Sequence, residues 1–352
     1  MSRRQEHVIM NIAINCMNAL KTQLRWKRSI SLLLMVVLSA GACGDDGLDK
    51  KSVLKTYRVI AIKADPPALT LNEPTEITLF DFHPQDLSAS GRPAVDYQLT
   101  LCPFSLGSVT QYECLFDEVS LDDLIHVSME REEEGLDEVN RENSEAQSGG
   151  VRPQPNLTLK MTASDLLELL GDDLQTQLDQ LEMGADMLGS EMSFFDAGQI
   201  DLYVKLLVKI EGEPDFSAVK SIPLILTSDI EVNQNPTLTG VSADQLKDMV
   251  SEGDELKLRA VFSSSSAETY TPPLSAEAES QDQEATEKTE TLLFSWYTTS
   301  GSFDKPLRLQ EDTSTTLTLG EESGPQRLYL TLRDGRGGVD LMMINFDITP
   351  QP

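Results

Sequence analysis

The side chains that could do chemistry in this chain are few, with four cysteines and three histidines among 352 residues. Cys43 is the most informative of them. It follows a basic cluster that ends at Arg28 and an apolar and small-residue segment at 30–42, which are the parts of a secretory signal peptide. That segment is shorter than the roughly 20 residues that cross a bilayer. We therefore expect residues 1–42 to be a cleaved signal peptide and not a transmembrane anchor.

The position of Cys43 directly after small residues resembles a bacterial lipoprotein box, in which this thiol is acylated and becomes the first residue of the mature protein. The chain departs from that box at Ala40, where Leu or Val is usual. Residues 40–42 also fit the A-x-A site of ordinary signal peptidase, and that cut would leave Cys43 with a free thiol. We expect lipidation, because a free cysteine at an exported N-terminus has no evident use. The true start (Met1, Met10 or Met17) stays open.

The resemblance implies a membrane anchor made of covalent N-acyl and diacylglyceryl lipid, such as palmitate, on Cys43. No other cofactor is expected. Gly44 stands where an aspartate is associated with retention in the inner membrane of some bacteria, so we expect an outer-membrane lipoprotein. Two or three acyl chains would give stable anchoring. Whether the protein faces the periplasm or the cell surface stays open.

The charge of the mature chain argues against several partners. Removing residues 1–42 takes six basic and one acidic residue from totals of 28 and 58, which leaves a net charge of −35. Such a chain repels nucleic acid and anionic lipid surfaces, so we expect no nucleic-acid partner. No D-x-[DN]-x-[DN]-G loop is present, and we therefore predict no metal site from motif, while calcium binding stays open.

The remaining cysteines fit export. Cys16 would leave with the signal peptide, so Cys102 and Cys114 form an even pair in an oxidising compartment. We predict a disulfide between them, with two buried free thiols as the alternative. A redox or metal role is disfavoured, because the chain has no C-x-x-C motif and no histidine near either cysteine.

No catalytic apparatus is visible. After the signal peptide only His83 and His126 remain, and the chain lacks G-x-S-x-G, H-E-x-x-H and a phosphate-cradling glycine loop. His83 precedes Pro84 at a strand end, so we expect it to face solvent in a loop. We predict that the protein is not an enzyme, and a hydrolase in particular is not expected.

Alternating apolar patterns divide the chain into two units after a tether at 43–55. The first, 56–230, has predicted strands at 56–64, 75–82, 95–101, 200–210 and 219–227. An acidic loop and a helical insertion occupy about 117–195. Within it, Thr162 and Asp165 predict a helix start and Gly171 its end, and a leucine stripe at 174–192 predicts a second helix.

The second unit, 231–352, repeats the first in outline, because residues 250–258 parallel 71–79 as a turn that feeds a strand. A low-complexity acidic insertion at about 263–290 is expected to be disordered. Trp296 lies within a strand, where we expect it to fill the core, and its indole N–H needs a partner. Further strands are predicted at 292–297, 313–319, 327–333 and 339–348, with a glycine-rich hairpin turn at 334–338 between the last two.

Residues 57–67, Cys102-Pro103 and 233–236 resemble Gram-negative lipoproteins with Ig-like domains. Residues 294–301 and 333–339 are similar to the Trp-bearing strand and closing hairpin of PKD-like modules. The fold expected is mainly β, with two Ig-like antiparallel β-sandwich domains, the first with a helical insertion. The resemblance implies attachment to the cell envelope and adhesion or ligand contact, and it carries over no catalytic residue.

Two function classes remain. The first is a binding or adhesion module with an envelope protein or a glycan as partner, because sandwich domains present functional loops at their ends. The second is a structural spacer or an assembly subunit without a small ligand. An exposed aromatic patch would favour binding, and a uniformly polar, acidic surface would favour the spacer. The oligomeric state does not follow from the sequence.

Overall fold

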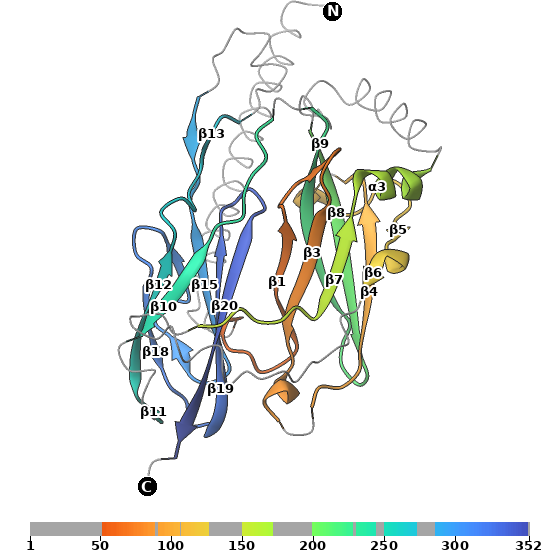
Figure 1. Ribbon diagram of the computed structural model, residues 1–352. Helices are drawn as coiled ribbons and strands as arrows, with labels where there is room; N and C mark the ends of the chain where they lie inside the picture. The colour runs from red at the N-terminus through yellow and green to blue at the C-terminus, as the bar shows by residue number, and fades with distance from the viewer. Residues whose placement is uncertain are drawn as a thin grey trace, which may run out of the picture. The chain divides into compact units, whose positions relative to one another are not determined.

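The computed structural model describes residues 51–88, 91–105, 107–126, 150–171, 199–227, 230–243, 250–272 and 286–350 (Figure 1). Residues 51–352 form one compact unit. The predicted signal peptide, Cys43 and most of the tether lie outside the described residues. So do most of the acidic loop, the leucine stripe at 174–192 and the centre of the acidic insertion.

The first half of the unit is a sandwich of two sheets. One sheet has the strand order β1 (Arg58–Asp65), β3 (Thr75–Phe82), β7 (Leu157–Met161), β6 (Ile125–His126). The other has the order β2 (Leu69–Thr70), β9 (Phe216–Ile225), β8 (Gln199–Ile210), β4 (Val95–Cys102), β5 (Val119–Ser120). Neighbours are antiparallel except β2 and β9, which are parallel.

The second half repeats this spatial order of strands. Its sheets are β10 (Leu238–Ala243), β12 (Glu255–Phe262), β18 (Ser314–Thr318), β16 (Ser302–Phe303), and β11 (Val250–Ser251), β20 (Val339–Thr349), β19 (Gly324–Arg333), β15 (Leu293–Thr298), β17 (Leu307–Leu309). Its two short edge strands, β16 and β17, come in the opposite order along the chain from their counterparts in the first half. The short first strand of the second sheet, β11, is again parallel to the last strand. This is the strand order of Ig-like sandwiches, so the predicted mainly β, Ig-like fold is confirmed.

Alternating side chains explain why these segments are strands. In β12 the residues Leu256, Leu258 and Ala260 are buried while the residues between them are exposed. Trp296 in β15 is fully buried, as predicted. The expectation that its indole N–H finds an acceptor is not met, because the nitrogen has no partner among the described residues.

The predicted helix start is confirmed in α3 (Ala163–Leu170). The Asp165 backbone N–H donates to the Thr162 hydroxyl at 3.0 Å, and the Thr162 N–H donates to the Asp165 carboxylate at 2.8 Å. This reciprocal pair satisfies two amides that the first helical turn would otherwise leave unbonded. The structure also describes three short 3₁₀ turns: η1 (Pro84–Leu87), η2 (Gly107–Thr110) and η3 (Asp122–Leu124).

Two insertions are smaller than the sequence predicted. The first, at 117–195, contains β5, β6 and β7, and β7 is an interior strand with Leu157, Leu159 and Met161 buried. The second, at 263–290, was expected to be disordered, but its ends form a two-stranded ribbon of β13 (Thr269–Tyr270) and β14 (Lys288–Thr289). The two-residue strands carry too few residues for a visible alternation, whereas β7 alternates over five residues and was missed beside an acidic stretch.

The two sandwiches pack against each other through a separate apolar cluster, which we call the junction. It brings β1 and β3 of the first sandwich against β19 and β20 of the second (Figure 1). Phe82 meets Tyr329 edge to face, with ring centroids 6.2 Å apart. Backbone bonds also cross the junction, from Leu54 N–H to Thr298 O at 2.7 Å and between Val151 and Met343 in both directions. The sandwiches therefore belong to one unit.

Candidate functional site

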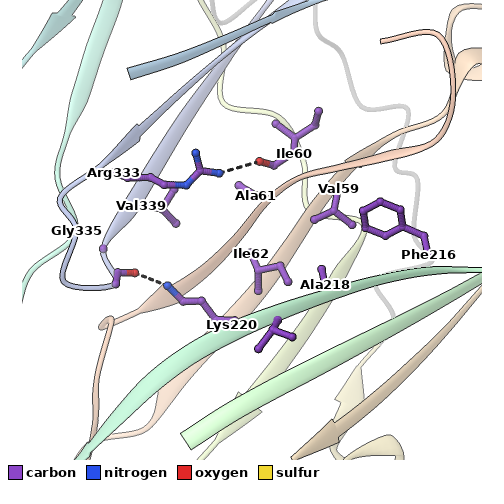
Figure 2. A pocket seen from close by; sticks show the side chains of 13 residues that line it. Val59, Ile60, Ala61, Ile62, Phe216, Ala218, Lys220, Arg333, Gly335 and Val339 are labelled. Carbon is purple, nitrogen blue, oxygen red and sulfur yellow. Dashed lines mark hydrogen bonds between the residues drawn. The ribbon is translucent and has the colours of Figure 1, made fainter. Parts of the chain in front are cut away.

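A cavity of about 340 Å³ lies beside the junction, and we call it the groove (Figure 2). Its walls come from three elements: β1, β9 and the turn between β19 and β20. The side chains on β1 and β9 are almost all apolar, and the turn adds glycine backbone. The lining residues are Val59, Ile60, Ala61, Ile62, Phe216, Ala218, Val219, Lys220, Arg333, Gly335, Gly337, Gly338 and Val339.

The edge of β1 forms one wall. β1 is the outermost strand of its sheet, with β3 on its other side. The carbonyl of Ile60 accepts a hydrogen bond from the Arg333 guanidinium at 3.4 Å, and the carbonyl of Ala64 accepts one from the Asn235 amide at 2.8 Å. Because backbone groups alternate along a strand, Ile62 points its own N–H and C=O to this same edge.

The turn that forms the opposite wall is built around one buried carboxylate. The Asp334 carboxylate accepts hydrogen bonds from the Arg336 N–H at 2.7 Å and the Gly338 N–H at 2.9 Å. A side chain at Gly338 would collide with this carboxylate, and Gly337 has a φ of +104°, which favours glycine. The predicted glycine-rich turn is therefore confirmed, and its composition brings bare backbone up to the groove.

A second contact holds the turn from outside. The Arg336 guanidinium lies over the Tyr270 ring of β13, 4.0 Å from its centroid, and donates to Glu290 at 3.0 Å. Glu290 is buried, and burial raises the pKa of its carboxyl. The ribbon that the sequence predicted to be disordered thus positions one wall of the groove.

Two cations reach the groove without a carboxylate partner. Lys220 projects from β9 and donates to the carbonyl of Gly337, and Arg333 donates to Ile60 (Figure 2). Within the described part of the chain, no Asp or Glu oxygen lies within ion-pair distance of either group, although acids outnumber bases two to one over the whole chain. Burial lowers the pKa of Lys220 to about 8, although the negative charge of Asp334 acts to raise it.

A larger cavity, about 410 Å³, lies where the segment 233–237 meets β1 and β20. Its lining is polar and largely hydrogen-bonded within itself. The Asn235 side chain joins Ala64 O to the Val339 N–H, and Arg152 pairs with the buried Asp340. We interpret this cavity as part of the joint that holds the sandwiches together.

A buried ionic cluster lies at one end of the first sandwich. The Asp81 carboxylate accepts 2.7 Å hydrogen bonds from the hydroxyls of Tyr57 and Tyr97, and it pairs with Arg92. Burial, followed by the charge of Asp81, raises the pKa of both phenols above their usual range. Arg92 also forms a bidentate pair with Asp86, at 2.9 Å for both bonds. Every charge here has a partner, so the cluster is structural.

The sequence-predicted residues Cys102, Cys114 and His83 are not among the residues that line the groove. Cys102 and Cys114 form the predicted disulfide, which ties the end of β4 to the loop after it. His83 was expected to face solvent, and this is wrong: it is buried, its Nε2 lies 2.9 Å from Glu213, and its Nδ1 accepts from the Gln85 N–H. A histidine that caps η1 gains these bonds by turning inward. His126 lies in β6, and Cys43 lies outside the described residues.

Sequence reasoning missed Lys220 and Arg333. Lys220 is the only charged residue in β9, which was a usable signal, but nothing in the sequence placed it opposite the turn 334–338. In the described ranges no three His, Cys, Asp or Glu side chains are grouped to hold a metal ion. No helix in those ranges has the length and apolar character to cross a membrane.

Comparisons with known proteins add little to this geometry. No family model and no curated protein matches the chain. Similar solved structures include the fibronectin(III)-like modules of Clostridium thermocellum CbhA, with 9% identity, a TM-score of 0.22 and coverage of 82% of this chain and 95% of that chain. The D00-D0 domain of intimin has 8% identity and a TM-score of 0.22, with coverage of 84% of this chain and 98% of that chain. The Yersinia pseudotuberculosis adhesin InvE has 11% identity and a TM-score of 0.19, with coverage of 81% of this chain and 58% of that chain. Such TM-scores carry no argument, so the Ig-like assignment comes from strand order.

Proposed function

We propose that this chain is a lipid-anchored lipoprotein of the outer membrane and that its joined sandwiches act as a binding module. The groove is the observation that carries the proposal. It combines an apolar lining, glycine backbone and two cations that have no carboxylate partner among the described residues, and a mostly apolar lining with a few polar groups is usual for a ligand site. The anchor rests on the sequence around Cys43 and would hold this site near a membrane.

The spacer remains the second candidate, and one observation favours it. The large apolar side chains that are exposed in the described residues are all aliphatic and scattered, as in Leu71, Leu115 and Leu307, with no aromatic patch among them. A protein whose function is contact through a flat surface would present such a patch. The binding proposal therefore depends on the groove and not on an exposed face.

The anchor is tested by metabolic labelling with a clickable palmitate analogue. We expect the wild-type chain to carry label and to fractionate with the outer membrane, and the Cys43→Ala variant to be unlabelled and released. Protease shaving of intact cells then assigns the face. Loss of the segment 132–141 from intact cells would mean surface display, and loss only after the outer membrane is opened would mean a periplasmic position. An unlabelled wild-type Cys43 peptide of unmodified mass would overturn the anchor.

The binding function is tested with liposomes that carry the acylated full-length chain, applied to immobilised envelope proteins and to a glycan array. Ala218→Trp fills the groove, and Ser217→Trp places the same side chain at the exposed neighbouring position on β9. We expect the wild type and Ser217→Trp to be retained and Ala218→Trp to be lost. Equal retention of all three would exclude the groove as the site. No retention of any of them would favour the spacer.

A further inference from the structure

We propose that the groove takes a small carboxylate with an apolar body, whose carboxylate pairs with Lys220 and Arg333. This inference rests on the proposed binding function and specifies the chemistry of its ligand. The apolar body would lie against β1 and β9, and the charged end would lie at the turn 334–338 (Figure 2). A free short-chain acid and the C-terminus of a short peptide share this chemistry.

The charge of the ligand follows from the two cations. Lys220 uses one of its three donors on Gly337, and Arg333 makes only long contacts, at 3.4 Å to Ile60 O, 3.4 Å to Ser295 Oγ and 3.3 Å to Thr331 Oγ1. Donors therefore remain on both groups. A carboxylate would bring both cations the opposite charge that no described Asp or Glu supplies within ion-pair distance, and it would give Arg333 shorter hydrogen bonds than its present ones.

The position of Asp334 explains why the protein does not neutralise the site itself. Its carboxylate is already committed to the Arg336 and Gly338 amides and to the Asn233 side chain at 2.9 Å. It lowers the cost of holding Lys220 charged, but it cannot turn towards the amine without breaking the turn. The charge on Lys220 is therefore left for a ligand.

The size of the ligand follows from the volume. About 340 Å³ is at the small end of the range for ligand sites, roughly 300–1,000 Å³. Val59, Ile62, Phe216 and Ala218 offer apolar contact, and the Ile62 N–H points to the same edge as the Ile60 carbonyl that Arg333 holds. A body of a few carbons, or one or two residues of extended peptide, fits this lining.

The pH dependence of binding gives a readout that a merely structural lysine would not produce. Two charged groups face the Lys220 amine: Asp334 on the turn and Arg333 on β19. Apart from Lys220 itself, the residues of β1 and β9 that line the groove are not titratable. With the pKa of Lys220 at about 8, the amine loses its charge as the pH rises through that value. Carboxylate affinity should therefore fall above pH 8, and binding near pH 8 should take up a proton.

The experiment is calorimetric titration of the acylated full-length chain in nanodiscs, with empty nanodiscs as the blank. The probes are hexanoate and acetyl-Ala-Leu with a free C-terminus, each matched with a neutral partner, 1-hexanol and acetyl-Ala-Leu amide. We expect at least one carboxylate to saturate the site at pH 7, with its neutral partner roughly tenfold weaker or more, the loss of one charge-assisted bond. The probe that binds tighter identifies the source.

The variants separate charge from folding. Lys220→Gln should weaken the bound carboxylate roughly tenfold, Lys220→Arg should restore most of the affinity, and Lys209→Gln, on the exposed face of β8, should leave it unchanged. Saturable binding of neither carboxylate, or equal binding of the neutral partners, would overturn the proposal. If the carboxylate proposal fails in this way but the liposomes are still retained through the groove, the proposed binding function is unaffected. Carboxylate binding without retention would instead remove the adhesion role alone.

Discussion

The two sandwiches share one strand order but stabilise their centres by different means. The second fills its core with aromatic rings, with Trp296 and Phe294 fully buried and Phe303 6.2 Å from the indole centroid. The first has an aliphatic core and adds the ionic cluster around Asp81 at one end. It also carries the disulfide, which has no counterpart among the described residues of the second sandwich.

This difference shows that strand order and core chemistry are separable. Strand order requires only alternation and turns at suitable spacing, and both sandwiches meet that requirement. The ionic cluster of the first sandwich reaches the second one through Asp86, which accepts from Arg92 and lies 3.8 Å from Arg327 of β19. This cluster therefore adds a polar contact between the two sandwiches beside the apolar junction.

Trp296→Ala tests the apolar core and should have the largest effect. We expect a loss of about 3–5 kcal/mol in the free energy of unfolding, because the change opens a cavity where a fully buried ring was. Trp296→Phe should cost much less, since the indole N–H has no partner to lose. Urea unfolding followed by far-UV circular dichroism measures both. A loss for Trp296→Phe as large as that for Trp296→Ala would contradict this expectation.

Asp81→Ala tests the ionic cluster and should cost about 3 kcal/mol, because it leaves Arg92 with one partner and removes the acceptor of two buried phenols. Asp96→Ala, on the exposed side of β4, is the control and should change stability by less than about 0.5 kcal/mol.

Trp296 is the only tryptophan after residue 42 and reports on the second sandwich. If its fluorescence midpoint does not shift with Asp81→Ala, the sandwiches unfold independently.

Most of the fold was predictable from the sequence. The strands at 75–82 and 95–101, the capped helix after Thr162 and the repeat of 71–79 in 250–258 all agree with the structure, because their signals are local. The two-residue strands were missed, since pairing with a longer neighbour stabilises them and not their own pattern. His83 was misplaced for a related reason: its partner Glu213 is 130 residues away in sequence.

The groove was not predictable. Its walls are separated by more than 270 residues along the chain, from Val59 to Val339, and only the packing of one sandwich on the other brings them together. Lys220 and Arg333 look like ordinary strand residues until the turn 334–338 is placed beside β9. The disulfide, in contrast, followed from the number of cysteines and the export signal alone.

Removing the disulfide should have an intermediate effect and act only on the first sandwich. The bridge closes a loop of about 13 residues, so the Cys102→Ser, Cys114→Ser double variant should lose about 3 kcal/mol, mainly through a less restricted unfolded state. Denaturant midpoints of the oxidised wild type and the double variant measure the loss. A loss that also occurs when the wild type is reduced would confirm the cause, and no loss in either case would contradict it.

The smallest effect should come from the charge on Lys220. Its pKa is lowered from 10.5 to about 8 by burial, so between these values the unfolded chain binds more protons than the folded one. The free energy of unfolding attributable to this group therefore rises with pH across that window, by about 1 kcal/mol once solvent screening of a partly exposed side chain is allowed for.

The difference in the free energy of unfolding between wild type and Lys220→Met separates the contribution of Lys220 from that of the tyrosines, whose raised pKa values act above pH 10. The difference should favour the variant at pH 7 and shrink by pH 9.5. Bound carboxylate should abolish this slope, because it restores the charge that burial disfavours, and a slope that persists with ligand would place the carboxylate elsewhere.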